Sequence, residues 1–259
     1  MYLCPVPRVH LFHTCLINEF APDTGFAVVR VLERLGYEVH VPLAQTCCGQ
    51  PAFNAGFHDD ARAAARHTIA TLEGTDGPVI IPSGSCGDMI IHQYIALFAE
   101  DAAWRQRAHA IAARCREFSA FVAGHLDGTP LGTLSAKVAY HPSCHLLRGL
   151  GVDREPRAVL GAVVGVESRA LAMDDECCGF GGLFSVKHGD ISSRMLERKI
   201  AHVNASGADR LVSCDLGCLL HIGGGLHRQG SSIKVQHLAD LLEDANVRAA
   251  TPGDEGASR

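Results

Sequence analysis

The sequence predicts an α/β fold of two tandem, pseudo-symmetric domains, each with a Rossmann-like parallel sheet and with cysteines at the carboxyl ends of its strands. Two observations support this prediction. Short apolar segments alternate with longer amphipathic ones, which is typical of parallel strands joined by helical crossovers. The cysteine pattern also repeats with an offset of 129 to 130 residues, from Cys15 to Cys144 and from Cys47 to Cys177. A chain of 259 residues with such a repeat is long enough for two domains, each with its own core.

In the first half, short strands are expected at residues 9–13, 37–41 and 78–81, and each is followed by a cysteine. A helix is expected between the first two strands, capped by Asp23 and ended by Gly36. Its apolar positions recur every three residues: Phe26, Val29, Leu32 and Leu35. An alanine-rich helix follows over about residues 59–72.

The second half repeats this order. Strands are expected at residues 137–141, 166–171, 209–213 and 233–236, with helices at 156–163, at 191–205 and ending near Leu242. Residues 102–126 have a helical pattern. The predicted boundaries are therefore 1–101 for the first domain, 102–136 for a helical linker, 137–248 for the second domain and 249–259 for a disordered tail.

Two Cys-Cys-Gly tripeptides, at residues 47–49 and 177–179, lie inside the repeated cysteine pattern. With 11 Cys and 27 Gly in the chain, chance would give on the order of 0.05 such tripeptides. Ligands of open parallel sheets bind beyond the carboxyl ends of the strands, where all these cysteines are expected. The candidate cofactor and metal ligands are Cys15, Cys47, Cys48 and Cys86 in the first half, and Cys144, Cys177, Cys178, Cys214 and Cys218 in the second.

Such thiolates serve as disulfide partners, as zinc ligands or as ligands of iron–sulfur clusters. The cysteine count is odd, and Met1 to Pro5 show no basic stretch followed by an apolar one, so we expect a reducing, cytoplasmic location rather than a disulfide framework. Two cysteines that are adjacent in the sequence also form a disulfide bond only with strained geometry. Structural zinc sites usually contain Cys-x2-4-Cys pairs, whereas single cysteines here lie about 30 residues from each vicinal pair. Iron–sulfur clusters are favoured, and zinc at one site or both remains the alternative.

Residues around the cysteines suggest how a negatively charged cluster would be held. The glycines that follow the vicinal pairs, Gly49, Gly179, Gly181 and Gly182, could turn backbone amides toward sulfur. Near the ligands in sequence lie Lys187, Arg148, His145 and His221. Cys4 and Cys115 fall outside the pattern, and Cys115 is expected to be a buried packing residue.

Composition excludes several classes of function. The formal net charge is −5 and no basic stripe is interleaved with aromatic residues, so no nucleic-acid partner is expected. No apolar run approaches the roughly 20 residues of a membrane-spanning helix. No Gly-x-Gly-x-x-Gly, Walker or nucleophile-elbow motif is present, so neither a nicotinamide site nor hydrolase chemistry is predicted.

Four motifs resemble those of a known family. They are residues 46–56 around the first vicinal pair, Pro82-Ser83-Gly84-Ser85-Cys86, His141-Pro142-Ser143-Cys144-His145 and residues 176–182 around the second pair. They resemble the cysteine-rich CCG domain, found twice in one subunit of heterodisulfide reductase and also in the glycolate oxidase iron–sulfur subunit. The match is closer to the lactate utilization protein A family of stand-alone two-domain proteins, and it covers nearly the whole chain.

The resemblance implies an iron–sulfur redox subunit of an L-lactate dehydrogenase complex, which acts with an iron–sulfur subunit and a third small subunit and is not active alone. It implies one [4Fe–4S] cluster in each domain. A noncubane cluster is implied for the five-cysteine set of the second half, in which the last pair is Cys-x3-Cys rather than the Cys-x2-Cys of the reductase. The alternative functions are a subunit of a thiol–disulfide reductase and a zinc-bearing assembly protein without electron transfer.

Overall fold

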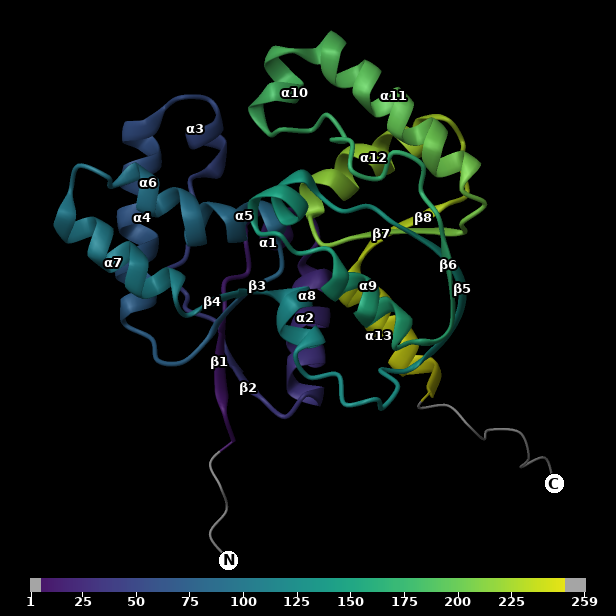
Figure 1. Cartoon of the computed structure of the whole chain (residues 1–259), viewed down its shortest axis with the longest axis horizontal. Coiled ribbons are helices and arrows are strands. Elements are labelled where there is room, and N and C mark those ends of the chain that lie inside the picture. The colour runs from purple at the N-terminus through teal and green to yellow at the C-terminus, as the bar shows by residue number, and fades with distance from the viewer. Residues whose placement is uncertain (1–5, 250–259) are drawn as a thin grey trace, which may run out of the picture.

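A computed structural model describes residues 6–249 of the chain (Figure 1). Cys4 and the predicted tail from residue 250 onward lie outside this range. The two halves each form a four-stranded, all-parallel sheet flanked by helices, which confirms the predicted α/β fold class. Both sheets have the same strand order, β2-β1-β3-β4 in the first half and β6-β5-β7-β8 in the second. The duplication seen in the cysteines therefore extends to the whole topology.

The strands of the first sheet are β1 Arg8–Leu11, β2 Glu38–His40, β3 Val79–Ile81 and β4 Cys115–Glu117. Those of the second sheet are β5 Thr133–Tyr140, β6 Val164–Arg169, β7 Arg210–Ser213 and β8 Lys234–His237. In each sheet the second strand pairs on one side of the first strand and the third pairs on the other. Such a reversal of strand order opens a crevice at the carboxyl ends of the strands, where ligands of this architecture bind.

The helices of the first half are α1 Cys15–Phe20, α2 Pro22–Arg34, α3 Gln50–Asn54, α4 His58–Glu73, α5 Gly84–Asp88, α6 Tyr94–Leu97, α7 Ala102–Ala112 and α8 Phe118–Ala123, with a π-helical turn, η1, at Met89–Gln93. Those of the second half are α9 Arg154–Gly161, α10 Leu183–Lys187, α11 Gly189–Ala205, α12 Leu216–Arg228 and α13 Leu238–Ala249, with a π-helical turn, η2, at His145–Gly149. The short helices α1, α3, α5 and α10 directly follow or contain predicted ligands.

The uninterrupted helical pattern expected over residues 102–126 is wrong at its centre. Residues 115–117 form β4, which pairs in parallel with β3 and completes the first sheet. Alanine-rich sequence precedes this strand, in which the side chains of Cys115 and Glu117 are buried while Arg116 between them is exposed. A three-residue strand is too short for a period of two to be visible in the sequence.

The expectation that each half has its own core is only partly correct. One core cluster belongs to the first half alone, around α4 and α7, and another belongs to the second half alone, around α11 and α12. Two further clusters contain residues of both halves: a large one, called here the shared cluster, and a small one of Ile17, Leu216 and Leu219. Successive strand residues face opposite sides of a sheet, so Ile80 enters the shared cluster while Val79 and Ile81 enter the first-half cluster.

Four helices supply the shared core from between the two sheets. Figure 1 shows α2 lying beside α13 and α8 lying close to α9. Helices α2 and α9 lie between the first and second strands of their halves, and α8 and α13 follow the last strands, so the internal pseudo-symmetry relates the two pairs. At the edge of the α2–α13 contact, Arg30 and Arg34 each lie 2.7 Å from a carboxylate oxygen of Glu243. The two halves therefore pack against each other as one unit and not as independent domains.

The apolar positions expected on helix α2 are partly correct, because Leu32 is buried and Val29 and Leu35 pack against the shared core as partly buried residues. The buried residues of α2 are Thr24, Ala27, Val28, Val31 and Leu32. Phe26, predicted to face inward, is 61% exposed.

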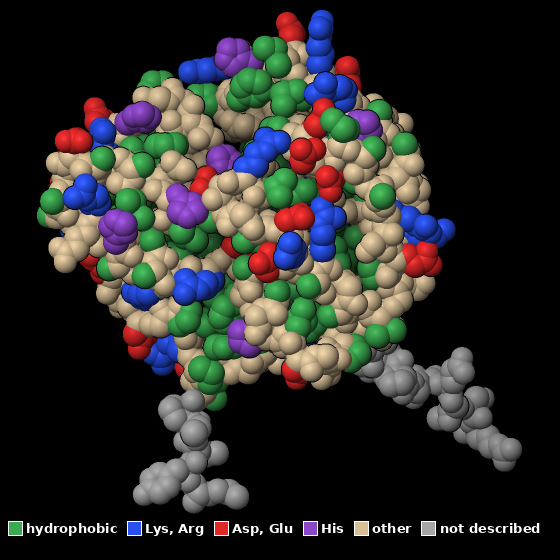
Figure 2. Space-filling model, viewed as in Figure 1, with side chains coloured by type: hydrophobic (Ala, Val, Ile, Leu, Met, Phe, Trp, Pro, Cys, Tyr) green, Lys and Arg blue, Asp and Glu red, His purple; other side chains and the backbone are tan. Residues whose placement is uncertain are grey.

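Opposite charges are mixed over the face of the molecule in Figure 2, where Lys and Arg side chains lie among Asp and Glu side chains. Within residues 6–249 the structure contains no helix that is both long enough and apolar enough to cross a bilayer.

Glu117 provides a test of this packing through pH. It is 2% exposed at the junction of β4 and α8, where its Oε2 accepts from the Ala120 amide and its Oε1 has no partner among the described residues. Burial raises the pKa of Glu117 from 4.5 to about 7. The folded state then holds a proton that the unfolded state has lost, so stability falls as pH rises from about 4.5 through 7 and the penalty reaches about 3 kcal/mol above that range.

Glu117→Gln keeps an oxygen to cap α8 but cannot ionise. Its unfolding free energy relative to the parent protein should therefore rise by roughly 2–3 kcal/mol between pH 5 and pH 8. Urea unfolding of both proteins in the same metal-bound or metal-free state measures this difference. If the difference in unfolding free energy between the two proteins did not change with pH, burial would not raise the pKa of Glu117.

Candidate metal centre

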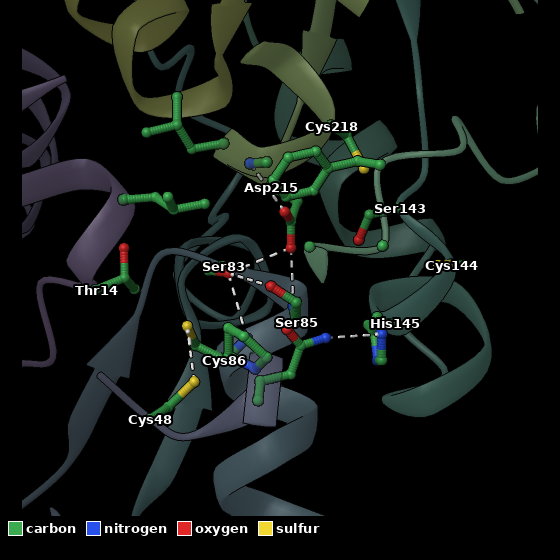
Figure 3. A pocket seen from close by; sticks show the side chains of 18 of the residues that line it. Thr14, Cys48, Ser83, Ser85, Cys86, Ser143, Cys144, His145, Asp215 and Cys218 are labelled. Carbon is green, nitrogen blue, oxygen red and sulfur yellow. Dashed lines mark hydrogen bonds between the residues drawn. The ribbon is translucent and has the colours of Figure 1, made fainter. Parts of the chain in front are cut away.

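Eight of the nine cysteines predicted as ligands line one pocket between the two halves, with a cavity volume of about 130 Å³ (Figure 3). They are Cys15, Cys47, Cys48, Cys86, Cys144, Cys177, Cys178 and Cys218. The loops after β1, β2 and β3 supply one set of four, and the loops after β5, β6 and β7 supply the other. The duplicated sheets thus carry two four-cysteine sites, called here the first and the second site, that face one pocket.

In the first site, two capped helix starts position the outer cysteines. Thr14, held at a left-handed φ of 59°, caps α1 by accepting a hydrogen bond from the Ile17 amide, and Cys15 follows as the first helical residue. Ser83 caps α5 and accepts from the amide of Cys86 at 3.3 Å. The Sγ atoms of Cys86 and Cys48 are 3.3 Å apart.

The second site repeats this construction with different capping residues. The Ser143 hydroxyl accepts from the Leu146 amide beside Cys144, in the place of Thr14. Asp215 caps α12 in the place of Ser83. The Sγ atoms of Cys178 and Cys218 are again 3.3 Å apart. Both sites therefore present the same arrangement of sulfur atoms at helix starts, where backbone N–H groups favour negative charge.

The vicinal pairs depend on the glycine that follows each of them. Gly49 and Gly179 have φ of 85° and 91°, a conformation that favours glycine. A Cβ at Gly179 would also lie 2.8 Å from the Ser192 carbonyl oxygen. In this turn the amides of Gly49 and Gly179 point back to the sulfur atoms of Cys47 and Cys177, each at 3.4 Å.

One thiol in each site is favoured as a thiolate. Hydrogen bonds from Cys15, from Cys48 and from the Gly49 amide lower the pKa of Cys47. The equivalent bonds from Cys144, from Cys178 and from the Gly179 amide lower the pKa of Cys177. A thiolate is the form of cysteine that binds metal.

Cys214 does not lie with the other eight. It is fully buried in the core shared by the two halves, and burial raises the pKa of its thiol well above the usual range. Its sulfur is 3.9 Å from the Tyr140 hydroxyl. Cys86 and Cys218 are each the fifth residue after the end of their strand, so Cys214 occupies the position of Pro82 in the first half. The prediction of a five-cysteine set finds no support in this placement.

Cys115 is 2% exposed in the first-half core, in line with its expected packing role, although it lies in a strand rather than a helix. Burial raises the pKa of its thiol to about 12.

Polar contacts join the two sites across the interface. Asp215 Oδ2, from the second half, accepts from the Ser85 amide at 2.9 Å and from the Ser83 hydroxyl at 3.2 Å (Figure 3). Asp88, from the first half, lies 3.0 Å from His145 Nδ1, and His145 Nε2 lies 3.1 Å from Gln50 Nε2. Although burial alone would raise it, the hydrogen bonds from His145 and His92 lower the pKa of Asp88.

Of the four basic residues near the ligands in sequence, only His145 lines the pocket. The polar residues Gln50, Ser85 and Asp215 were missed by sequence reasoning. Asp215 had a usable signal, because an aspartate shortly after a strand, at the point where a helix begins, is a typical helix cap. The contacts between the halves left no such signal in the sequence.

Another residue missed as part of the site is His141, which is fully buried and has a ring nitrogen within 4.8 Å of the sulfur atoms of both Cys178 and Cys218. Burial and the charge of Lys199 lower the pKa of His141 to about 3, so its imidazole is neutral.

The residues present fit an iron–sulfur cluster in each site. Each half offers four convergent soft thiolate ligands and backbone amides directed at sulfur. Cys178, Cys218 and His141 also form a set that zinc accepts.

Comparisons with known proteins agree with the duplicated site. The profile of the cysteine-rich (CCG) domain family matches residues 9–91 and 138–223, which include all eight cysteines of the pocket. Lactate utilization protein A of an Exiguobacterium species is 45% identical over 246 residues, which cover 94% of this chain and 100% of that protein. The protein of the same name from Shouchella clausii is 46% identical over 236 residues, covering 91% of this chain and 98% of that protein.

Among solved structures, a hypothetical protein from Helicobacter pylori has a TM-score of 0.63 at 12% identity. The match covers 94% of this chain and 49% of that one, so this chain spans about half the length of that protein. This likeness concerns the fold alone. With two matched domains and relatives aligned over almost their full length, the chain belongs to the cysteine-rich (CCG) domain family, in its lactate utilization protein A branch.

Proposed function

We propose that this chain is the iron–sulfur redox subunit of a complex that oxidises L-lactate to pyruvate in a reducing, cytoplasmic compartment. The observation that carries the proposal is the convergence of two four-cysteine sites on one pocket. The names of the relatives supply the metabolic setting, since they are lactate utilization proteins. As partners we propose an iron–sulfur subunit and a third small subunit.

In this proposal Cys15, Cys47, Cys48 and Cys86 hold one [4Fe–4S] cluster, and Cys144, Cys177, Cys178 and Cys218 hold the other. Bound clusters supply one-electron transfer, which the side chains of a protein cannot provide by themselves. The Gly49 and Gly179 amides donate to ligand sulfur and offset its negative charge. Leu16, Phe180 and Leu216 line the pocket and keep water from the sulfur atoms.

The second candidate function is a thiol–disulfide reductase subunit. One observation favours it, namely that both thiol sets face the same pocket, so that a small sulfur compound between them could reach each set. The third candidate is a zinc protein without electron transfer, which the Cys–Cys–His group of the second site favours.

Metal and sulfide analysis separates the third candidate from the other two. Protein that is purified anaerobically or reconstituted with iron and sulfide should be brown and contain about eight iron and eight sulfide per chain. Stoichiometric zinc without sulfide after the same treatment would rule out electron transfer by this chain.

A reconstitution assay separates lactate oxidation from disulfide reduction. The loaded chain is mixed with its two proposed partner subunits. The reduction of an artificial electron acceptor is measured with L-lactate, and, separately, the conversion of a disulfide to thiols is measured with a reduced artificial electron donor and no other acceptor. We expect lactate-dependent reduction by the full mixture and none when this chain is omitted. The chain alone should not oxidise lactate, because its sequence has no flavin or nicotinamide motif. Turnover by the isolated chain would move the catalytic site into this subunit.

A further inference from the structure

The second site contains a buried imidazole that has no counterpart in the first. His141 is 0% exposed, and neither of its ring nitrogens has a hydrogen-bond partner among the described residues. A ring nitrogen lies within 4.8 Å of the sulfur atoms of Cys178 and Cys218. A buried imidazole without partners is costly, because its N–H has lost its hydrogen bonds to water. A sulfur acceptor in the adjoining site would remove this cost.

In the first site an apolar ring takes the place of His141. His141 follows β5, and its amide donates to Val212 of β7 at 2.8 Å. Phe12 follows β1, and its amide donates in the same way to Ile80 of β3 at 2.9 Å. Phe12 is 1% exposed, as buried as His141, but it offers no donor. The two positions are thus equivalent in the backbone and different in chemistry.

A buried positive charge adds to the difference. Lys199 of α11 is 0% exposed, and its ammonium donates to the Met173 and Asp174 carbonyl oxygens at 2.7 and 3.3 Å, in the loop that leads to the second vicinal pair. The first-half residue equivalent to Lys199 follows from the contacts of the glycine after each vicinal pair. Gly179 lies against Ser192 and Met195 of α11, and Gly49 lies against Ala61 and Ala64 of α4. The same offset places uncharged Thr68 of α4 at the position of Lys199.

We propose that His141 donates its N–H to a sulfur atom of the cluster in the second site and that Lys199 adds positive charge beside it, so that this cluster has the higher reduction potential of the two. Hydrogen bonds to sulfur and nearby charge are two of the means by which a protein sets the potential of a cluster. An electron that reaches the first cluster then passes to the second, which is reduced by one electron while the first is oxidised by one. This inference rests on the proposed iron–sulfur function.

The test compares the potentials of the two clusters in the full chain, reconstituted anaerobically and followed by electron paramagnetic resonance during a redox titration. Cys48→Ser and Cys178→Ser proteins, each with one intact site, assign the signals. His141→Phe copies the first site, His141→Gln retains an N–H donor, and Phe12→His introduces a donor at the first site.

We expect His141→Phe to lower the ratio of reduced to oxidised second cluster at least tenfold at a fixed potential, which is a shift of about 59 mV for a one-electron couple. The reduction potential of the first cluster should not change in this variant. His141→Gln should restore part of the potential, and Phe12→His should raise that of the first cluster. Lys199→Met should lower the second potential in the same direction as His141→Phe.

Two results would overturn the inference alone. The first is a second-cluster potential in His141→Phe protein that equals that of a parent protein holding both clusters. The second is loss of second-site iron in both His141 variants, since His141 would then be a ligand or a structural residue rather than a donor. Parent protein without iron and sulfide would instead refute the proposed function, and the inference with it.

Discussion

Replacing Cys178 with Ser is expected to remove the cluster of the second site and to leave the first intact, so that the chain retains about half of its iron and acid-labile sulfide. Cys178 is buried with its sulfur 3.3 Å from that of Cys218, and both belong to the second half. A serine oxygen is a poor replacement for a thiolate toward a soft metal site. Iron and sulfide are measured after anaerobic reconstitution, and circular dichroism checks that the variant is folded.

Three further variants make this experiment specific. Cys48→Ser should remove the first cluster and spare the second. Cys115→Ala should keep both clusters, because Cys115 packs in the first-half core away from the pocket. Cys214→Ser should also keep both, since Cys214 does not line the pocket, whereas a five-cysteine cluster would lose its iron. Equal loss of iron from both sites in folded Cys178→Ser protein would mean that the two cysteine sets share one cluster.

The prediction of the fold class and of the convergence of eight cysteines was possible because both depend on local signals. Parallel strands bring their carboxyl ends to one edge, and each of these cysteines follows a strand closely in the sequence. The same rule misplaced Cys214, because it does not distinguish a residue directly after a strand from one at the start of the following helix. After β7 the helix-start residue Cys218 faces the pocket, whereas Cys214, directly after the strand, does not.

Features formed between distant segments could not be predicted from the sequence. The shared core, the contact of Asp215 with Ser83 and Ser85, and the choice of the buried face of α2 all arise when the two halves pack together. Helix α12 was not predicted for a different reason, because three consecutive glycines, Gly223, Gly224 and Gly225, suggest a loop. In the structure, Gly225 allows close packing against Leu196 and Ile200 of α11.

A close contact between the two halves gives the second prediction with a large effect. Gly84 begins α5 in the first half, and it lies directly against η2 of the second half. A Cβ added at Gly84 would be 2.6 Å from the Leu146 Cβ and 2.9 Å from the Leu146 backbone nitrogen. Since backbone atoms cannot move aside as the end of a side chain can, the clash must separate α5 from η2.

Gly84→Ala is therefore expected to lower the unfolding free energy by roughly 1–3 kcal/mol or more. It should also reduce the occupancy of both sites, because Cys86 is in α5 and Cys144 directly precedes η2. Thermal unfolding and the iron content of reconstituted protein measure the two effects. The matched control is Gly224→Ala, an exposed glycine inside α12 with nothing within 4 Å of an added Cβ, which should stabilise the helix by roughly 0.5–1 kcal/mol.

The double loss distinguishes Gly84→Ala from the cysteine variants, which each affect one site. If Gly84→Ala protein kept full iron at both sites and the melting temperature of the parent, the two halves would not be in the close contact described. If it lost stability but kept both clusters, the interface would support the fold without positioning the cysteines. Loss of both clusters with a folded chain is the expected result, because Cys86 lies in α5, Cys144 directly precedes η2, and both cysteines line the same pocket.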